Sequence, residues 1–182
     1  HRQSSAASDV YKRQPVDRRE WSMSPQTVNA YFSPTKNEIV FPAAYLQPPN
    51  FNPKADDAVN YGAIGVTIGH EISHAFDDKG SQFDGDGNLR NWWTKEDRDN
   101  FDKRTGLLAD QYSQYEVLPG RKLNGELTLG ENIADLGGAK AAFRAYKISL
   151  KGEPSPIIDN YTGEQRFFIG TAQSDRVKFR DE

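Results

Sequence analysis

Residues 69–77 read Gly69-His70-Glu71-Ile72-Ser73-His74-Ala75-Phe76-Asp77, and this stretch decides the fold. His70 and His74 are four residues apart, so on a helix both imidazoles project from one face about one turn apart. That spacing lets two ring nitrogens reach one Zn²⁺ at roughly 2.0–2.1 Å. Glu71 lies at the edge of the same face, where it can reach a water on the metal without binding the metal itself. The stretch therefore predicts a zinc site on a helix.

The residues around this motif are unusually apolar. From about Ala55 to Phe76 the apolar positions follow a helical period: Val59, Ala63, Ile64, Val66, Ile68, Ile72, Ala75 and Phe76. We expect such a helix to be buried over most of its surface. Two ordinary histidines would fit it poorly, because ionisable groups in an apolar interior need partners. A divalent cation would supply that partner.

Three glycines, Gly62, Gly65 and Gly69, recur along the same predicted helix. A phosphate-binding loop would need a preceding strand and a Lys followed by Ser or Thr, and the sequence lacks both here. We therefore interpret the glycines as positions of close packing against the zinc helix.

Composition limits what else the chain can bind. It has 182 residues, a formal charge of −3, three histidines and no cysteine. Without cysteine there is no thiolate zinc site, so histidine and carboxylate must hold any metal. Because one histidine is His1, the metal hypothesis rests on the other two. The mild, interspersed charge argues against a nucleic-acid partner, and no apolar run approaches the roughly eighteen residues of a membrane span.

A catalytic zinc takes a third protein ligand and keeps one position open for water. The best downstream candidate is Glu131, which shares a face with Asp135 on a predicted helix from about Leu129 to Leu150. The alternative is a capping box, in which Glu131 pairs with Thr128 and binds a backbone N–H at the helix start. Periodicity alone does not decide between these interpretations.

The remaining pattern predicts an α+β fold that is mainly helical. Val28–Phe32 and Glu38–Phe41 are predicted strands around a turn. A second helix is predicted to begin at Thr94, because Asp97 three residues later completes a capping-box pattern. A fourth, shorter helix is predicted from Tyr161 to Gln173.

The first fourteen residues, 1–14, have no apolar period and resemble translated adapter or vector sequence. A disordered native terminus is the alternative. In either case we exclude them from the expected domain, which comprises residues 15–182; the family resemblance described next implies that this domain is an incomplete metallopeptidase catalytic domain.

Three motifs occur together: residues 28–32 (Val28-Asn29-Ala30-Tyr31-Phe32), residues 69–77, and residues 130–138 (Gly130-Glu131-Asn132-Ile133-Ala134-Asp135-Leu136-Gly137-Gly138). In this order they resemble the neprilysin family of gluzincin zinc endopeptidases. The resemblance extends over residues 28–173. It implies a thermolysin-like α+β fold with a short strand edge, within the C-terminal catalytic domain of a bacterial member.

The resemblance assigns a role to each motif residue. His70, His74 and Glu131 match the ligands of one Zn²⁺ per chain. Glu71 matches the catalytic carboxylate that takes a proton from the zinc-bound water as the water attacks a peptide carbonyl. The family's activity would be hydrolysis of oligopeptides.

Four further residues match supporting roles. Asp77 and Asp135 match carboxylates that hold the ligand imidazoles through their other ring N–H, and Asp135 also counts among the catalytic residues. Asn29 and Ala30 match an edge segment that binds the substrate backbone, so that the peptide lies beside a strand.

Family members are longer than this chain. They carry a helical lid domain before the region and a C-terminal segment with a His and an Arg, and no His follows His74 here. We therefore expect a fragment that is weakly active or inactive alone; the alternative is a non-catalytic, zinc-stabilised binding module. The expected location is extracytoplasmic (periplasmic, cell-surface or secreted) in a bacterium, with the cytoplasm as the alternative.

Overall fold

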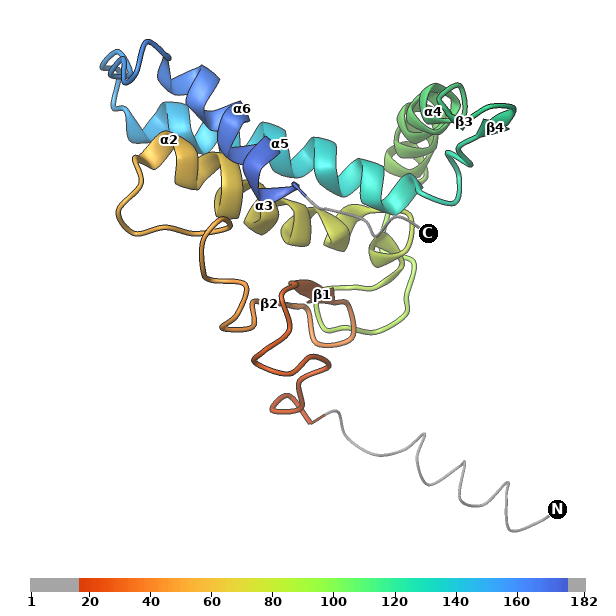
Figure 1. Cartoon of the computed structure of the whole chain (residues 1–182). Helices are drawn as coiled ribbons and strands as arrows, with labels where there is room; N and C mark the ends of the chain where they lie inside the picture. Colours follow the sequence, from red (N-terminus) through yellow and green to blue (C-terminus); the bar gives the residue numbers. More distant parts are fainter. Residues whose placement is uncertain (1–16, 177–182) are drawn as a thin grey trace, which may run out of the picture.

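The computed structural model describes residues 17–176 (Figure 1). The predicted terminal segment, residues 1–14, lies outside this range. The described part is mainly helical, with two small antiparallel sheets of two strands each. The predicted α+β class is therefore confirmed. None of the helices within residues 17–176 combines the length and the hydropathy needed to cross a membrane.

The first sheet is the predicted strand pair. Strands β1 (Tyr31–Ser33) and β2 (Glu38–Val40) run antiparallel, with Tyr31 opposite Val40. Asn37 has a φ of 48° in the turn between them, a left-handed conformation that asparagine tolerates better than most residues. Both strands are shorter than the sequence predicted.

The predicted helix over residues 55–76 is present but not uniform. It comprises α2 (Asp57–Asn60), a π-helical segment η1 (Tyr61–Gly65), α3 (Val66–Ser73) and a 3₁₀ turn η2 (His74–Phe76). Asp56 caps its N-terminus by accepting a hydrogen bond from the Ala58 N–H. The helical period therefore predicted the extent of the segment but not its π-helical turn.

The expected burial of this helix is wrong for the side chains of Ile68, Ile72 and Phe76, which are 40%, 49% and 51% exposed. Helices α5 (Leu129–Ser149) and α6 (Gly163–Ser174) cover the segment from one side (Figure 1). Composition reports how apolar a helix is, but it does not report how many neighbours cover it.

The other helices lie close to their predicted limits. Helix α4 (Lys95–Tyr112) has Thr94 as its N-cap, which accepts a hydrogen bond from the Asp97 N–H. A capping box between Thr162 and Gln165 starts α6. A short hairpin, β3 (Glu116–Leu118) and β4 (Arg121–Lys122), follows α4 and was not predicted.

The hydrophobic core lies where α2, α5 and α6 meet. Its fully enclosed members are Ala58, Ala142, Tyr146 and Phe167. Burial of this apolar surface is the main force that holds the helices together. The core therefore fixes α5 beside the helix that carries the two histidines.

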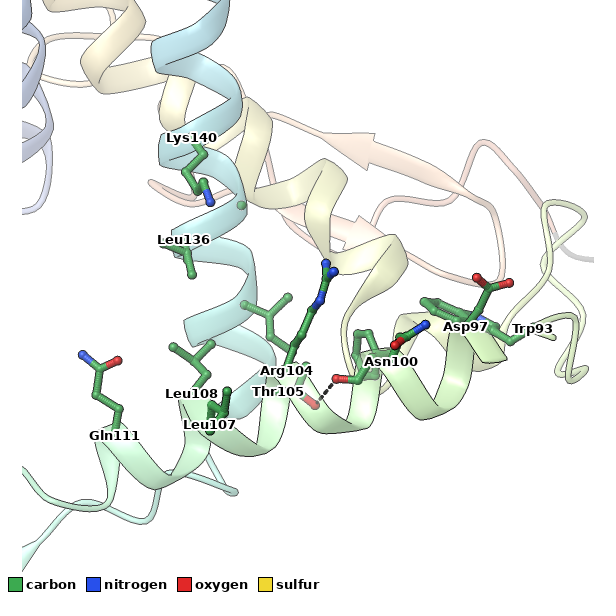
Figure 2. A pocket seen from close by; sticks show the side chains of 13 residues that line it. Trp93, Asp97, Asn100, Arg104, Thr105, Leu107, Leu108, Gln111, Leu136 and Lys140 are labelled. Atoms are coloured by element: carbon green, nitrogen blue, oxygen red, sulfur yellow. Dashed lines mark hydrogen bonds between the residues drawn. The ribbon is translucent and has the colours of Figure 1, made fainter. Parts of the chain in front are cut away.

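Helix α5 has different neighbours on its two sides. It packs closely along α3, which is the most extensive contact between elements in the described chain (Figure 1). Toward α4 it faces a hollow of about 730 Å³ instead. Figure 2 shows Leu107 and Leu108 of α4 and Leu136 and Lys140 of α5 lining this hollow. The position of α5 is thus set mainly by α3.

Candidate metal centre

The two motif histidines point at each other from the end of α3. His70 Nε2 and His74 Nε2 are 3.0 Å apart, and the rings are nearly perpendicular at 88°. Helical spacing of four residues places them on one face, as the sequence predicted. Both side chains are largely covered, with 19% and 17% of their surface exposed.

Glu131 approaches the same point from the first turn of α5. Its Oε2 lies 3.3 Å from His70 Nε2 and 3.7 Å from His74 Nε2. Ligand atoms that each lie about 2.0–2.1 Å from a tetrahedral zinc are roughly 3.3 Å apart. The three atoms therefore have the chemistry and the spacing that suit a zinc ion, and they form a possible metal-binding group.

The capping interpretation of Glu131 is wrong. Thr128 is the N-cap of α5, yet its side chain makes no capping hydrogen bond. The Glu131 carboxylate turns toward the histidines instead.

A carboxylate holds the other nitrogen of each imidazole. Asp135 Oδ1 lies 2.8 Å from His70 Nδ1, and Asp77 Oδ2 lies 2.7 Å from His74 Nδ1. A carboxylate accepts hydrogen bonds, so each Nδ1 carries the proton and each Nε2 presents a lone pair. Both lone pairs face the Glu131 carboxylate, and this tautomer is the one that binds a metal.

These hydrogen bonds shift the pKa of each partner. The bond to Asp77 raises the pKa of His74 against the opposing effect of burial. Burial lowers the pKa of His70, but the bond to Asp135 and nearby carboxylates outweigh it, so the net pKa is raised. Burial would raise the pKa of Asp77, but its bonds to His74 and to the backbone N–H groups of Gly80 and Lys79 lower it.

Glu71 lies beside this group and is only 5% exposed. Burial raises its pKa, although the neighbouring His70 and His74 partly oppose the shift. The backbone N–H of Phe32, in β1, also acts to lower the pKa. A buried carboxylate with a raised pKa is a better general base than an exposed carboxylate with the ordinary pKa.

A cleft of about 410 Å³ opens over these groups. Most of the residues that the sequence predicted for the site line it: Asn29, Ala30, His70, Glu71, His74, Asp77 and Glu131. Asp135 joins them through its bond to His70. The Asn29 carboxamide oxygen accepts a hydrogen bond from the Ala30 N–H at 2.9 Å.

The cleft also contains residues that sequence reasoning missed. Phe32 lies two residues after Ala30, so the period-two alternation of a strand could have placed it on the same face. Leu127, which is 77% exposed, precedes the helix that carries Glu131. An apolar side chain at an exposed helix entry was the available signal.

The family model for peptidase family M13 matches residues 29–182. The chain belongs to this family. The resemblance to neprilysin-like zinc metallopeptidases is therefore confirmed.

Two relatives of this M13 chain are neprilysin-11 of Caenorhabditis elegans and human endothelin-converting enzyme 1. The first is 51% identical over 87% of the chain and 19% of the relative, and the second is 51% identical over 88% and 21%. A solved structure, the Mycobacterium tuberculosis zinc metalloprotease Zmp1 in complex with an inhibitor, superimposes with a TM-score of 0.86. It is 55% identical, and the match covers 93% of this chain and 27% of that one. The M13 chain thus spans about a fifth of the curated relatives' length.

Proposed function

We propose that this chain holds one Zn²⁺ on His70, His74 and Glu131 and forms the catalytic metal centre of an oligopeptide-cleaving endopeptidase. The observation that carries the proposal is the convergence of two Nε2 lone pairs and one carboxylate oxygen, 3.0–3.7 Å apart. Three lone-pair-bearing atoms that face one point repel each other unless a cation lies between them. The printed name of Zmp1, a zinc metalloprotease, agrees with this choice of metal.

Glu71 is proposed as the general base. When bound, zinc supplies a Lewis acid that polarises the scissile carbonyl and makes water more acidic. A Glu71 carboxylate oxygen then accepts a proton from the attacking water and later donates it to the leaving amine. Its burial and raised pKa support this role, because proton transfer is efficient when the pKa of the base approaches the working pH.

Asp77 and Asp135 are proposed to orient the imidazoles. Each holds an Nδ1 proton and so directs the opposite nitrogen at the metal position. Two backbone N–H groups, from Lys79 and Gly80, in turn hold Asp77 at 2.8 and 2.6 Å. Asp77 is therefore fixed from both sides.

Strand β1 is proposed to align the substrate. In the described residues β1 pairs only with β2, so no strand covers its other edge. Asn29 and Ala30, just before β1, line the cleft that contains the metal group. An extended peptide could add to this edge as a further strand, with its scissile bond near Glu71.

Metal analysis and peptide cleavage test the proposal together. The purified chain is expected to bind one zinc per molecule and to cleave a quenched fluorescent oligopeptide slowly. Replacing Glu71 with Gln should keep the zinc and abolish the cleavage, whereas replacing His74 with Ala should weaken zinc binding. A chain that binds no zinc after reconstitution would contradict the proposal.

A zinc-loaded chain that cleaves no faster than its Glu71→Gln variant would favour the other candidate, a non-catalytic zinc-stabilised binding module. The cleavage experiment thus separates the two functions. The helical lid domain, the C-terminal His and Arg, the bacterial source and the extracytoplasmic location stay predictions from the family resemblance.

A further inference from the structure

Helix α5 meets the histidine-bearing segment at positions that have no side chain. A Cβ atom added at Gly138 would lie 2.5 Å from the backbone nitrogen of His70, and one added at Gly137 would lie 2.5 Å from Ser73 Oγ. Such separations are well below van der Waals contact. At Gly138 the two helices are therefore as close as their backbones allow, whereas at Gly137 the Ser73 side chain limits the approach.

The contact at Gly138 is reciprocal. A Cβ atom added at Gly69, on α3, would lie 2.8 Å from the Cα of Gly138. Both partners in this contact are backbone atoms, so no change of side-chain rotamer can relieve it. Larger residues at either position would have to push the helices apart.

These contacts share a helix face with the metal group. Gly138 follows Asp135 by three residues and Glu131 by seven, so all three lie on one stripe of α5. His70 thus contacts α5 through its backbone at Gly138, while its ring nitrogens face Asp135 and Glu131. The separation of the two helices therefore sets the distance from the imidazoles to both carboxylates.

Gly137 and Gly138 lie in the interior of a 21-residue helix. Glycine is the poorest helix former after proline, so two in succession weaken α5. Close packing against α3 would offset this cost. Gly106 in α4 provides the contrast, because an added Cβ atom there would meet nothing within 4 Å. On its α4 side, moreover, α5 borders the hollow shown in Figure 2. Of Gly106, Gly137 and Gly138, only Gly138 would meet backbone atoms of another helix, and it does so on the side that carries the metal group.

We propose that Gly69, Gly137 and Gly138 are positioning residues that set the metal-ligand geometry by fixing the separation of α3 and α5. The inference rests on the proposed zinc centre. A methyl group at Gly138 would move Glu131 and Asp135 away from His70, and it would distort the coordination even where the chain still folds. Misplacement of the Asp135 partner alone is expected to weaken metal binding by about 10–100-fold.

Cobalt(II) substitution tests this inference, because the visible absorption of Co²⁺ reports coordination geometry. The full chain and its Gly137→Ala, Gly138→Ala and Gly106→Ala variants would be titrated with Co²⁺ and, by chelator competition, with Zn²⁺. Circular dichroism and thermal unfolding would measure folding in parallel. We expect Gly137→Ala and Gly138→Ala to bind both metals about 10–100-fold more weakly with a changed Co²⁺ band. The Gly106→Ala variant should have the metal affinities and the Co²⁺ band of the parent chain.

A compensating variant keeps the test independent of folding. Replacing Ser73 with Ala removes the Oγ atom and leaves the Ser73 Cβ position 3.2 Å from a new methyl group at Gly137. The Ser73→Ala/Gly137→Ala double variant should therefore recover most of the affinity and the band lost in Gly137→Ala. If Gly138→Ala does not fold, the comparison of Gly137→Ala with the double variant tests the inference instead.

The possible outcomes separate the two proposals. A parent chain that binds neither metal contradicts the zinc centre itself. If the parent binds both metals and the folded Gly137→Ala variant keeps its affinity and spectrum, the positioning inference is overturned. A lower melting temperature with unchanged metal binding would give the glycines a role in stability alone and would also overturn the inference.

Discussion

His70 Nδ1 lies 2.8 Å from Asp135 Oδ1, although 65 residues separate them in sequence. Asp135 is one helical turn beyond Glu131, whose carboxylate faces the other nitrogen of the same imidazole. Helix α5 thus supplies both a candidate metal ligand, Glu131, and the carboxylate that orients the His70 imidazole, Asp135. The metal group consequently depends on how α5 lies against α3.

Replacement of Asp135 with Asn tests this dependence. Asn keeps the size of the side chain but not its charge, so it holds the Nδ1 proton of His70 less strongly. We expect zinc affinity to fall about 10–100-fold, as measured by competition with a chromophoric chelator. The matched control is Asp110→Asn, an exposed carboxylate on α4, which should leave the affinity unchanged. Equal affinities in the two variants would remove the orienting role of Asp135.

Zinc is expected to stabilise the fold. A ligand that binds only the folded chain adds about 4 kcal/mol when its free concentration exceeds Kd a thousandfold. For a chain of this length each kcal/mol corresponds to roughly 2–4 °C, so chelation should lower the melting temperature by roughly 8–16 °C. Differential scanning calorimetry with and without a chelator measures the change. A His74→Ala variant should melt at one temperature under both conditions.

The metal-free chain should become less stable as the pH rises above about 6.5. The folded-state pKa values of His70 and His74 are raised above the ordinary value of 6.5. Between the unfolded and folded values the folded chain binds more protons, so the stabilisation is complete below about pH 6.5 and is lost as the pH rises through the folded values. Thermal melts in excess chelator between pH 6 and 8 are the measurement, and a melting temperature that rises over this window would contradict the assignment.

Zinc should reverse this trend. The metal needs both Nε2 atoms unprotonated, so protons compete with it most strongly at the low end of the same pH window. The increase in melting temperature that zinc produces should therefore grow from pH 6 to pH 8. The third histidine, His1, lies outside the described residues and away from the metal motif in sequence.

The histidine pair could be predicted from sequence because one local rule governs it. A spacing of four residues on a helix places His70 and His74 on one face in any tertiary context. Glu131 was different, since a ligand and a helix cap have the same local pattern after Thr128. Only the resemblance of the whole motif favoured the ligand, because the choice depends on a contact between residues 131 and 70.

Features set by tertiary contact were the ones that sequence missed. The π-helical segment η1 includes Gly62, where an added Cβ atom would overlap the Phe167 carbonyl, so α6 approaches this segment at backbone distance. The exposure of Ile68 and Ile72 reflects which elements cover α3. Gly62, Gly65 and Gly69 were predicted to be close-packing positions, and Gly69 does pack closely. Its partner Gly138 lies on α5, which is far away in sequence, so the sequence pattern could not identify this partner.

The stability of the core should depend on Arg166, which is 7% exposed. Its Nε lies 3.2 Å from Asp56 Oδ1, and its Nη1 donates to the backbone oxygens of Pro156 and Tyr161 at 2.9 and 2.6 Å. Replacing Arg166 with Met would leave the Asp56 carboxylate and both carbonyls without this partner. Breaking such a pair typically costs about 3–5 kcal/mol, and partial exposure of Asp56 favours the lower end of that range.

Urea denaturation at equilibrium measures the effect, with Arg144→Met as the control because Arg144 is exposed on α5. The control should change the unfolding free energy by less than about 0.5 kcal/mol. Zinc affinity of the folded Arg166→Met variant should stay at the parent value, because α6 packs mainly on α2 and η1. Equal denaturation midpoints for the two variants would show that the Asp56–Arg166 pair does not stabilise the core.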